Sequence, residues 1–198
     1  MTQIEAVIFD KDGTLFDFQA TWGHWTGTVL DQLCGDDLAL KSRVAEDLYY
    51  DLVGRKILPN SIVVAATPLE IATHMGAHFP QYSVNDLMHT LNDLAENSPQ
   101  VMVTDLTKFC ASLRTRRIKL AVMTNDAERP AKAHLKAAGA LAAFDFVIGS
   151  DSGYGGKPSA APLLALSDML GVAAGNCVMV GDSTHDLISG QAAGMKTV

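Results

Sequence analysis

Four short runs of apolar residues recur along the chain, and each is continuous rather than alternating with polar positions. They are Ile4–Phe9, Leu120–Met123, Phe144–Ile148 and Cys177–Val180. Continuous runs of this length are typical of strands that are buried on both faces, as in a parallel sheet covered by helices. The pattern therefore predicts a mainly parallel sheet, to which a last short strand from Met195 onward would be added.

The segments between the last three runs have the spacing of helices. Residues ahead of the second run follow the i, i+3, i+4, i+7 positions of one helix face: Leu106, Phe109, Cys110 and Leu113. The alanine-rich segment Ala127–Gly139 predicts another helix, and a third is expected after Ser159, with Leu163, Leu166 and Leu170 on its buried side. This alternation of strands and helices predicts a doubly wound α/β fold.

The connection between the first and second runs is too long for one crossover helix. From about Asp17 to about Ser98 the chain has helix-like segments and no convincing strand. The candidate helices are Leu38–Val53, Leu69–Phe79 and Val84–Ala95. A structureless loop of this length would be unusual inside a compact protein. We therefore predict an inserted helical domain of residues 17–98 and a core domain made of residues 1–16 and 99–198.

Composition and charge narrow the possible partners. Of the 198 residues 48% are hydrophobic and 19% charged, and the formal net charge is −7. Nucleic-acid binders usually carry a basic surface, so no nucleic-acid partner is expected. No apolar stretch approaches the ~20 residues of a membrane span, and Glu5 interrupts the only early apolar run, so neither a membrane partner nor a secretory leader is expected. The scattered Cys34, Cys110 and Cys177 predict buried free thiols and a cytoplasmic location.

Polar residues follow every predicted strand. In chain order they are Asp10, Asp12, Thr124, Asn125, Lys157, Asp182 and Asp186. Ligands of open parallel sheets bind beyond the carboxyl ends of the strands. We therefore expect these side chains to meet at one edge of the sheet.

This set of residues suits phosphoryl transfer with a carboxylate nucleophile. An aspartate can attack phosphorus and form an aspartyl-phosphate. Two anions approach each other only where positive charge is present, such as Mg²⁺ and a lysine. Mg²⁺ prefers oxygen ligands and takes one or two carboxylates, so Asp10 and Asp182 could hold it, with Asp186 beside them on a helix face. Lys157 and Thr124 would bind the phosphate oxygens.

Asp12 has a separate expected role. Residues i and i+2 of an extended segment point to the same side, so the side chains of Asp10 and Asp12 converge. A second carboxyl group beside the nucleophile can protonate the leaving group and then deprotonate the attacking water. By the same alternation, Lys11 is expected to point away from the phosphate.

The segments "FDKDGTL", "VMTND", "GKP" and "GDSTHD" resemble the four motifs of the haloacid dehalogenase-like (HAD) superfamily in its phosphatase branch, in the family's order and across nearly the whole chain. The insert resembles the helical cap of the subgroup that contains phosphoglycolate phosphatases and β-phosphoglucomutases. The resemblance implies a Rossmann-like core and a Mg²⁺-dependent hydrolase of a small phosphorylated metabolite, with a phosphoglycolate-like substrate as the first expectation.

The resemblance also implies a role for each candidate residue. The catalytic residues would be Asp10 as nucleophile, Asp12 as acid and base, Thr124 and Lys157. The phosphate-binding residues would be Thr124, Asn125 and Lys157. The metal ligands would be Asp10, Asp12 through its backbone carbonyl, Asp182 and Asp186.

Three other functions remain as alternatives. A phosphomutase shares Asp12, but the usual mutase motif continues Gly-Val where this chain has Gly13-Thr14. A signalling receiver also places acids, a threonine and a lysine at strand ends, but it has no large helical insert. A catalytically silent scaffold is disfavoured because every catalytic residue type is present. Dehalogenases lack the second aspartate, so hydrolysis of a phosphate ester is the favoured reaction.

Overall fold

The computed structural model describes residues 3–198, which form two compact units. The core unit contains the described residues up to Asp17 together with Met102–Val198, and the inserted unit is Phe18–Val101. The insert predicted from the sequence covers residues 17–98. The core unit is therefore made of two separate stretches of the chain, and the inserted unit of one.

Five strands form the sheet of the core unit, in the order β5-β4-β1-β6-β7, and every pairing is parallel. They are β1 (Ala6–Phe9), β4 (Lys119–Met123), β5 (Phe146–Ile148), β6 (Cys177–Val180) and β7 (Lys196–Thr197). Four of them fall within or next to the predicted apolar runs, and β7 begins one residue after Met195. The first strand in the chain lies at the centre of the sheet, so it can bond to a neighbour on each side.

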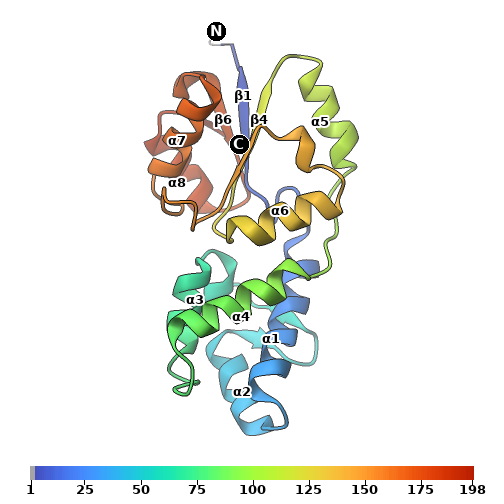
Figure 1. Ribbon diagram of the computed structural model, residues 1–198, viewed down its shortest axis with the longest axis vertical. Helices are drawn as coiled ribbons and strands as arrows, with labels where there is room; N and C mark the ends of the chain where they lie inside the picture. The colour runs from blue at the N-terminus through green and yellow to red at the C-terminus, as the bar shows by residue number, and fades with distance from the viewer. Residues whose placement is uncertain (1–2) are drawn as a thin grey trace. The chain divides into compact units, whose positions relative to one another are not determined.

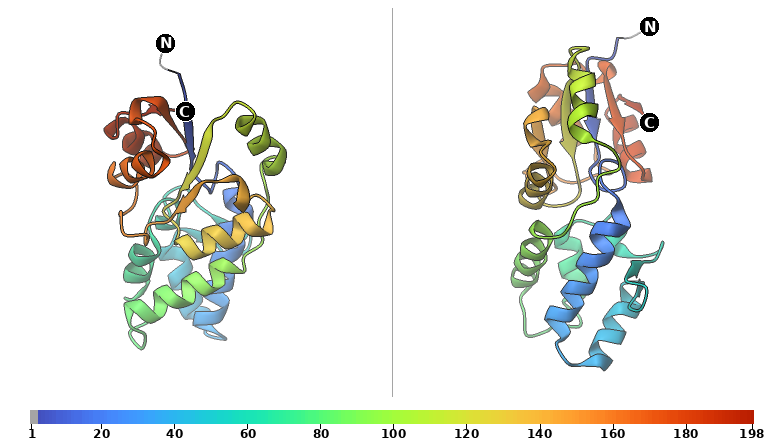
Figure 2. Two further views of the ribbon diagram at one scale, coloured as in Figure 1. Left: turned by 45° about the horizontal axis from the view of Figure 1, so that its top comes forward. Right: turned by 90° about the vertical axis from the view of Figure 1, so that its right-hand side faces the viewer.

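Helices cover both faces of this sheet (Figures 1 and 2). They are α5 (Leu106–Arg114), α6 (Glu128–Ala137), α7 (Ala161–Leu170) and α8 (Thr184–Ala192), with short 3₁₀ turns at Leu141–Ala143 and Ala174–Asn176. On one face Val7 and Phe9 pack with residues of α5 and α6, and on the other Ala6 and Ile8 pack with residues of α7. This arrangement confirms the predicted doubly wound α/β fold.

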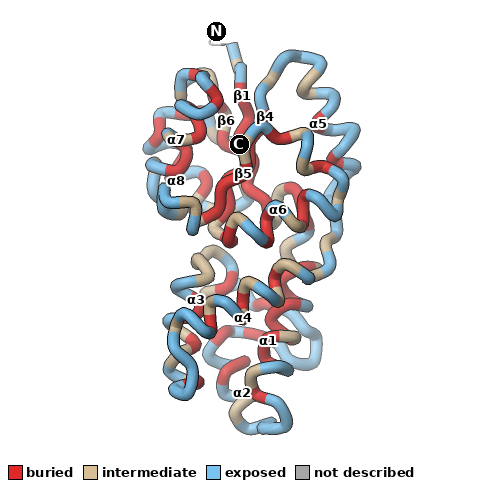
Figure 3. The backbone as a smooth tube through the Cα atoms, viewed as in Figure 1, coloured by how far each residue is buried: buried red, intermediate tan, exposed pale blue. Residues whose placement is uncertain are grey.

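Burial explains why the strands are apolar on both sides. All four residues of β1 are buried, and so are the last four of β4 (Figure 3). The predicted inner side of α7 is also confirmed, since Leu163, Leu166 and Leu170 are buried. The three cysteines are free and buried, as the sequence predicts.

The inserted unit is built mainly from helices around its own apolar cluster. Its elements are a π-helical turn (Gln19–Gly23), α1 (His24–Cys34), α2 (Leu38–Asp47), β2 (Tyr50–Asp51), β3 (Lys56–Ile57), a 3₁₀ turn (Ile62–Val64), α3 (Pro68–Met75) and α4 (Val84–Glu96). Trp22 and Trp25 pack edge to face, with ring centroids 5.0 Å apart, and the indole N–H of Trp25 donates to the carbonyl of Leu91 in α4 at 3.1 Å. These tryptophans therefore contribute to the core of the inserted unit.

The sequence prediction of an insert without strands is wrong at one place. The helix predicted over Leu38–Val53 ends at Asp47, and β2 and β3 then pair as an antiparallel hairpin. Tyr49, inside the predicted helix and directly before β2, has a positive φ of 51°, which a helix does not allow. Arg55, directly before β3, has a φ of 50°.

Distant residues hold this hairpin. The side-chain amide of Gln19 donates to the Ile57 carbonyl at 2.7 Å and accepts from the Ile57 N–H at 3.1 Å. The Tyr50 hydroxyl donates to the Gly23 carbonyl at 2.7 Å. Periodicity within the segment cannot report such contacts, which explains the error.

None of the helices in residues 3–198 combines the length and the apolar character that crossing a membrane requires.

Candidate active site

The backbone at the carboxyl edge of the sheet is fixed one residue beyond the ends of β1 and β4. The Asp10 N–H donates to the Val180 carbonyl of β6 at 2.8 Å, and the Thr124 N–H donates to the Ile148 carbonyl of β5 at 3.2 Å. The residues that follow β1 and β4 therefore continue the hydrogen-bond ladder of the sheet. This places Asp10 and Thr124 on a rigid part of the core unit.

Lys157 joins two of the predicted acids. Its ammonium group donates to Oδ1 of Asp10 at 2.6 Å and to Oδ1 of Asp186 at 2.5 Å. The side chain of Lys157 is only 4% exposed, and Asp186 is buried as well. Burial lowers the pKa of Lys157, but Asp10 and Asp186 raise it more, so the ammonium group stays charged. The structure thus brings together three residues that are far apart in the sequence.

Asn125 fixes the backbone of the loop that carries Lys157. Its side-chain Nδ2 donates to the Lys157 carbonyl at 2.9 Å, and its Oδ1 accepts from the Lys157 N–H at 2.8 Å. The phosphate-binding role that the sequence predicts for Asn125 stays a prediction, because Nδ2 has a second N–H besides the one donated to the loop. The observed contacts of Asn125 are those of a residue that positions Lys157.

Asp182 lies against the loop that follows β1. A Cβ atom added at Gly13 would lie 2.2 Å from Oδ2 of Asp182, and Gly13 has a φ of +86°. Only glycine fits both the angle and the approach. Carboxylate oxygens of Asp10, Asp182 and Asp186 lie within 4.8 Å of one another. The turn at Gly13 thus allows the acids that follow β1 and β6 to form one cluster.

The second oxygen of Asp186 is also bonded. Oδ2 accepts from the backbone N–H of Ser183 at 3.0 Å and from the Ser183 hydroxyl at 2.6 Å, at the start of α8. A carboxylate in the first turn of a helix is favoured there by the helix dipole. Asp186 is therefore held from the helix side while it contacts Lys157 on the other.

The electrostatics of the cluster fit a divalent cation. Burial raises the pKa of Asp10 to about 7, although Lys157 opposes the shift, and burial raises the pKa of Asp182 too. Within this cluster a single ammonium group faces three carboxyl groups, which leaves excess negative charge in a partly dry site. Clustered carboxylate oxygens of this kind are the ligands that Mg²⁺ prefers.

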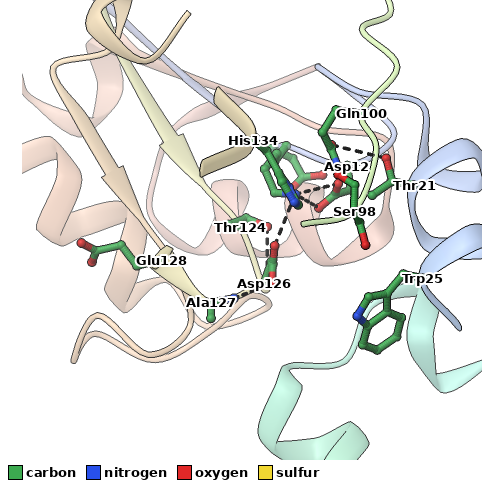
Figure 4. A network of polar contacts seen from close by, with 12 residues as sticks. Asp12, Thr21, Trp25, Ser98, Gln100, Thr124, Asp126, Ala127, Glu128 and His134 are labelled. Atoms are coloured by element: carbon green, nitrogen blue, oxygen red, sulfur yellow. Dashed lines mark hydrogen bonds and ion pairs between the residues drawn. The ribbon is translucent and has the colours of Figure 1, made fainter. Parts of the chain in front are cut away.

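Asp12 forms a second cluster, in which Lys11 has a place that the sequence does not predict. The Lys11 ammonium lies 2.8 Å from both carboxylate oxygens of Asp12 and 3.3 Å from Oδ2 of Asp126. It also lies 3.0 Å from Nδ1 of His134. Figure 4 shows Asp12, Asp126 and His134 converging on one point. The alternation of side chains along an extended segment does not predict this contact. The lysine side chain is long enough to turn back toward Asp12.

Thr124 and Asp126 connect this cluster to α6. The Asp126 N–H donates to the Thr124 hydroxyl oxygen at 3.1 Å, and Oδ1 of Asp126 accepts from the Ala127 N–H at 2.7 Å (Figure 4). The first contact uses a lone pair of the threonine oxygen, so its proton can still be donated to a ligand. No contact described for residues 3–198 joins Thr124 directly to the acids of the Lys157 cluster.

Sequence reasoning gave Asp126 and His134 no role, and for Lys11 it predicted only a direction away from the phosphate. A faint signal exists for His134, since Ala131, His134 and Leu135 share the buried side of α6 at helical spacing. The helical spacing indicates that His134 is buried, but nothing in the sequence around it indicates its contact with Lys11.

The sequence of this chain matches one known protein family and is similar to known phosphatases. The family model described as haloacid dehalogenase-like hydrolase matches residues 4–194. A phosphoglycolate phosphatase of Rhodospirillum rubrum is 44% identical over 200 residues, which cover 98% of this chain and 78% of the relative. A phosphoglycolate phosphatase of Neisseria meningitidis is 31% identical over 198 residues, covering 98% and 79%.

Solved structures show the same fold. CbbY from Rhodobacter sphaeroides, determined in complex with phosphate, has a TM-score of 0.70 at 18% identity, covering 98% of this chain and 85% of that one. The match extends over both units of the chain.

Proposed function

We propose a reaction for this chain, which belongs to the haloacid dehalogenase-like hydrolases and is a phosphatase. The chain hydrolyses the phosphate monoester of a small metabolite, with Mg²⁺ and with Asp10 as the nucleophile. The observation that carries the proposal is the buried contact of Lys157 with Asp10 and Asp186, beside the carboxylate of Asp182. A phosphoglycolate-like substrate is the first candidate, because the relative with 44% identity is a phosphoglycolate phosphatase.

Mg²⁺ would be held by the carboxylates of Asp10 and Asp182 and by the backbone carbonyl of Asp12, with Asp186 next to them. Three clustered carboxyl groups and a raised pKa at Asp10 support this assignment, since a cation would compensate their charge. When bound, the ion supplies positive charge that lets a carboxylate approach a phosphate dianion. Lys157 supplies the charge that the protein itself contributes.

In the first half of the proposed reaction, a carboxylate oxygen of Asp10 attacks phosphorus and the bond from phosphorus to the leaving oxygen breaks. Asp12 gives its proton to that oxygen. In the second half, water loses a proton to Asp12 and attacks phosphorus, so that phosphate leaves and Asp10 is regenerated. Lys157 and the Thr124 hydroxyl donate hydrogen bonds to the phosphate oxygens throughout. Asn125 positions Lys157 through its backbone.

The test is replacement of the nucleophile. We expect Asp10→Asn to abolish Mg²⁺-dependent phosphate release from p-nitrophenyl phosphate, because an amide cannot form the acyl-phosphate, and to leave the circular dichroism spectrum unchanged. Asp168→Asn makes the same chemical change on the exposed side of α7 and should retain full activity. Phosphate release by Asp10→Asn at the rate of the parent would refute the mechanism.

The substrate is identified by a panel of metabolite phosphates, scored by released phosphate with and without EDTA. Phosphoglycolate is expected among the best substrates. Conversion of a sugar phosphate into its isomer, without release of phosphate, would instead mark the phosphomutase alternative.

A further inference from the structure

Lys11 is a charged residue inside the core unit that the mechanism above does not use. Its side chain is 0% exposed. Burial of an unpaired ammonium group costs several kcal/mol, so such a group is retained only with close polar partners. The partners of Lys11 are Asp12, Asp126 and His134, and one of them is the proposed acid and base.

The ammonium group of Lys11 is the hydrogen-bond donor in these contacts. A lysine ammonium can only donate, so Nδ1 of His134 accepts its hydrogen bond at 3.0 Å. The ammonium group also donates to Asp12, and it forms an ion pair with Oδ2 of Asp126 at 3.3 Å. Four atoms around one ammonium group, three of them carboxylate oxygens, define its position closely.

The two partners behind Lys11 are themselves held. Oδ1 of Asp126 accepts the Ala127 N–H at the start of α6, and the Asp126 backbone is bonded to Thr124. His134 lies about two turns further along α6 and is buried. The end of β4 and the first turns of α6 therefore form an anchor for Lys11 that does not depend on Asp12.

Asp12 is the most exposed of these four residues, with a side chain that is 12% exposed. Both of its oxygens lie 2.8 Å from the anchored ammonium group. A carboxyl group transfers a proton efficiently only when it is held within hydrogen-bond reach of the reacting oxygen. A link from α6 through Lys11 to Asp12 supplies that restraint.

We propose that Lys11, anchored by Asp126 and His134, is a positioning residue that orients the carboxyl group of Asp12 for proton transfer to the leaving group. The inference rests on the proposed function, because it takes Asp12 to be the acid.

The experiment compares two substrates of similar shape at saturating Mg²⁺. Phenyl phosphate releases a phenolate with the basicity of a tyrosine side chain, whereas the p-nitrophenolate of p-nitrophenyl phosphate is much less basic and leaves without much help from an acid. The readout is kcat/KM, which covers the steps up to departure of the leaving group. We expect Lys11→Met to lower kcat/KM about 100-fold for phenyl phosphate and less than about 10-fold for p-nitrophenyl phosphate.

A purely structural role of Lys11 would give a different result. Loss of a buried ion pair that only supports the fold lowers activity on both substrates by the same factor, and that outcome would overturn the proposal. The Asp12→Asn variant separates the positioning role of Lys11 from the acid role of Asp12. A selective loss in Asp12→Asn with a uniform loss in Lys11→Met overturns only the role of Lys11, whereas a uniform loss in Asp12→Asn overturns the acid role of Asp12 as well.

A pair of substitutions at His134 keeps the test decisive if Lys11→Met does not fold. His134→Asn retains an acceptor near the place of Nδ1, and His134→Leu removes it at similar volume. We expect His134→Leu to lose activity on phenyl phosphate selectively and His134→Asn to recover most of it. Equal kcat/KM ratios of the two substrates in both variants and in the parent would refute the anchor.

Discussion

Asp10 combines two requirements that oppose each other. As the proposed nucleophile and metal ligand it would have to be ionised, yet burial raises its pKa to about 7 in the absence of metal. Lys157 lowers that pKa but does not restore the ordinary value of 3.8. Metal binding and proton loss at Asp10 are therefore linked, because the two cations compete for the same oxygens.

This linkage predicts the pH dependence of Mg²⁺ binding. Below about pH 7 Asp10 carries a proton that Mg²⁺ must displace, so the affinity should fall about tenfold for each pH unit and level off above pH 7. Titration calorimetry across this range measures the slope, and Asp10→Asn, which has no proton to lose, is the control. An affinity independent of pH would contradict the competition.

The raised pKa of Asp10 also determines how stability changes with pH. Between pH 3.8 and about 7 the folded, metal-free protein binds more protons at Asp10 than the unfolded chain does, so the contribution of Asp10 to stability should decrease as the pH rises through this window. Added Mg²⁺ should restore it most strongly at the upper end.

At this scale the sequence predicts residue types better than contacts. Asp10, Lys157, Asp182 and Asp186 could be found because each follows a strand of one parallel sheet. The amide contacts of Asn125 could not, since they depend on the path of the loop before Lys157 rather than on any local pattern.

Helix starts show how one sequence motif can serve two purposes. The segments at Ser83–Asp86 and Ser183–Asp186 both place an aspartate three residues after a serine, and in both the carboxylate accepts from the serine N–H and hydroxyl. At α4 the aspartate has only this capping role in the described contacts, whereas at α8 its other oxygen contacts Lys157. The two helix starts thus form a natural pair for comparison.

We expect Ser83→Ala and Ser183→Ala to lower the free energy of unfolding by about 1 kcal/mol each, through loss of a capping hydroxyl. Only Ser183→Ala should also reduce kcat/KM, by about tenfold, because Asp186 is then less restrained beside Lys157. Thermal unfolding and phosphate release measure the two effects. Equal activity of both variants would argue against a functional role for the α8 cap.

The strands of the core unit were predictable, whereas the hairpin of the inserted unit was not. The apolar runs located the strands of the core unit because burial on both faces leaves a continuous signal. The hairpin of β2 and β3 was missed because each strand has two residues and Gln19 and Gly23 supply its contacts. Short strands held by tertiary contacts carry little periodicity of their own.

At the scale of the whole molecule, the inserted unit has what an independent domain needs. Its buried apolar cluster contains residues of α1, α2, α3 and α4 and none from the core unit. Near its two ends, the Thr21 hydroxyl donates to Oε1 of Gln100 at 3.3 Å. The core unit has separate clusters on the two faces of its sheet.

We therefore expect residues 18–101, produced alone, to fold into a helical domain with a cooperative thermal transition followed by circular dichroism. Leu87→Ala should lower the stability of this fragment by about 2–5 kcal/mol, because Leu87 is fully buried in α4. A helical signal that declines gradually with temperature, without a transition, would contradict the prediction.

The central place of β1 has a consequence for synthesis on the ribosome. The strand that ends next to Asp10 emerges first, but its neighbours β4 and β6 comprise residues 119–123 and 177–180. At roughly 5–20 residues per second, β1 waits several seconds for its first partner, and the inserted unit emerges completely in that interval. The acids at 182 and 186 come later still. A nascent chain therefore carries the proposed nucleophile long before it carries the groups that would make it reactive.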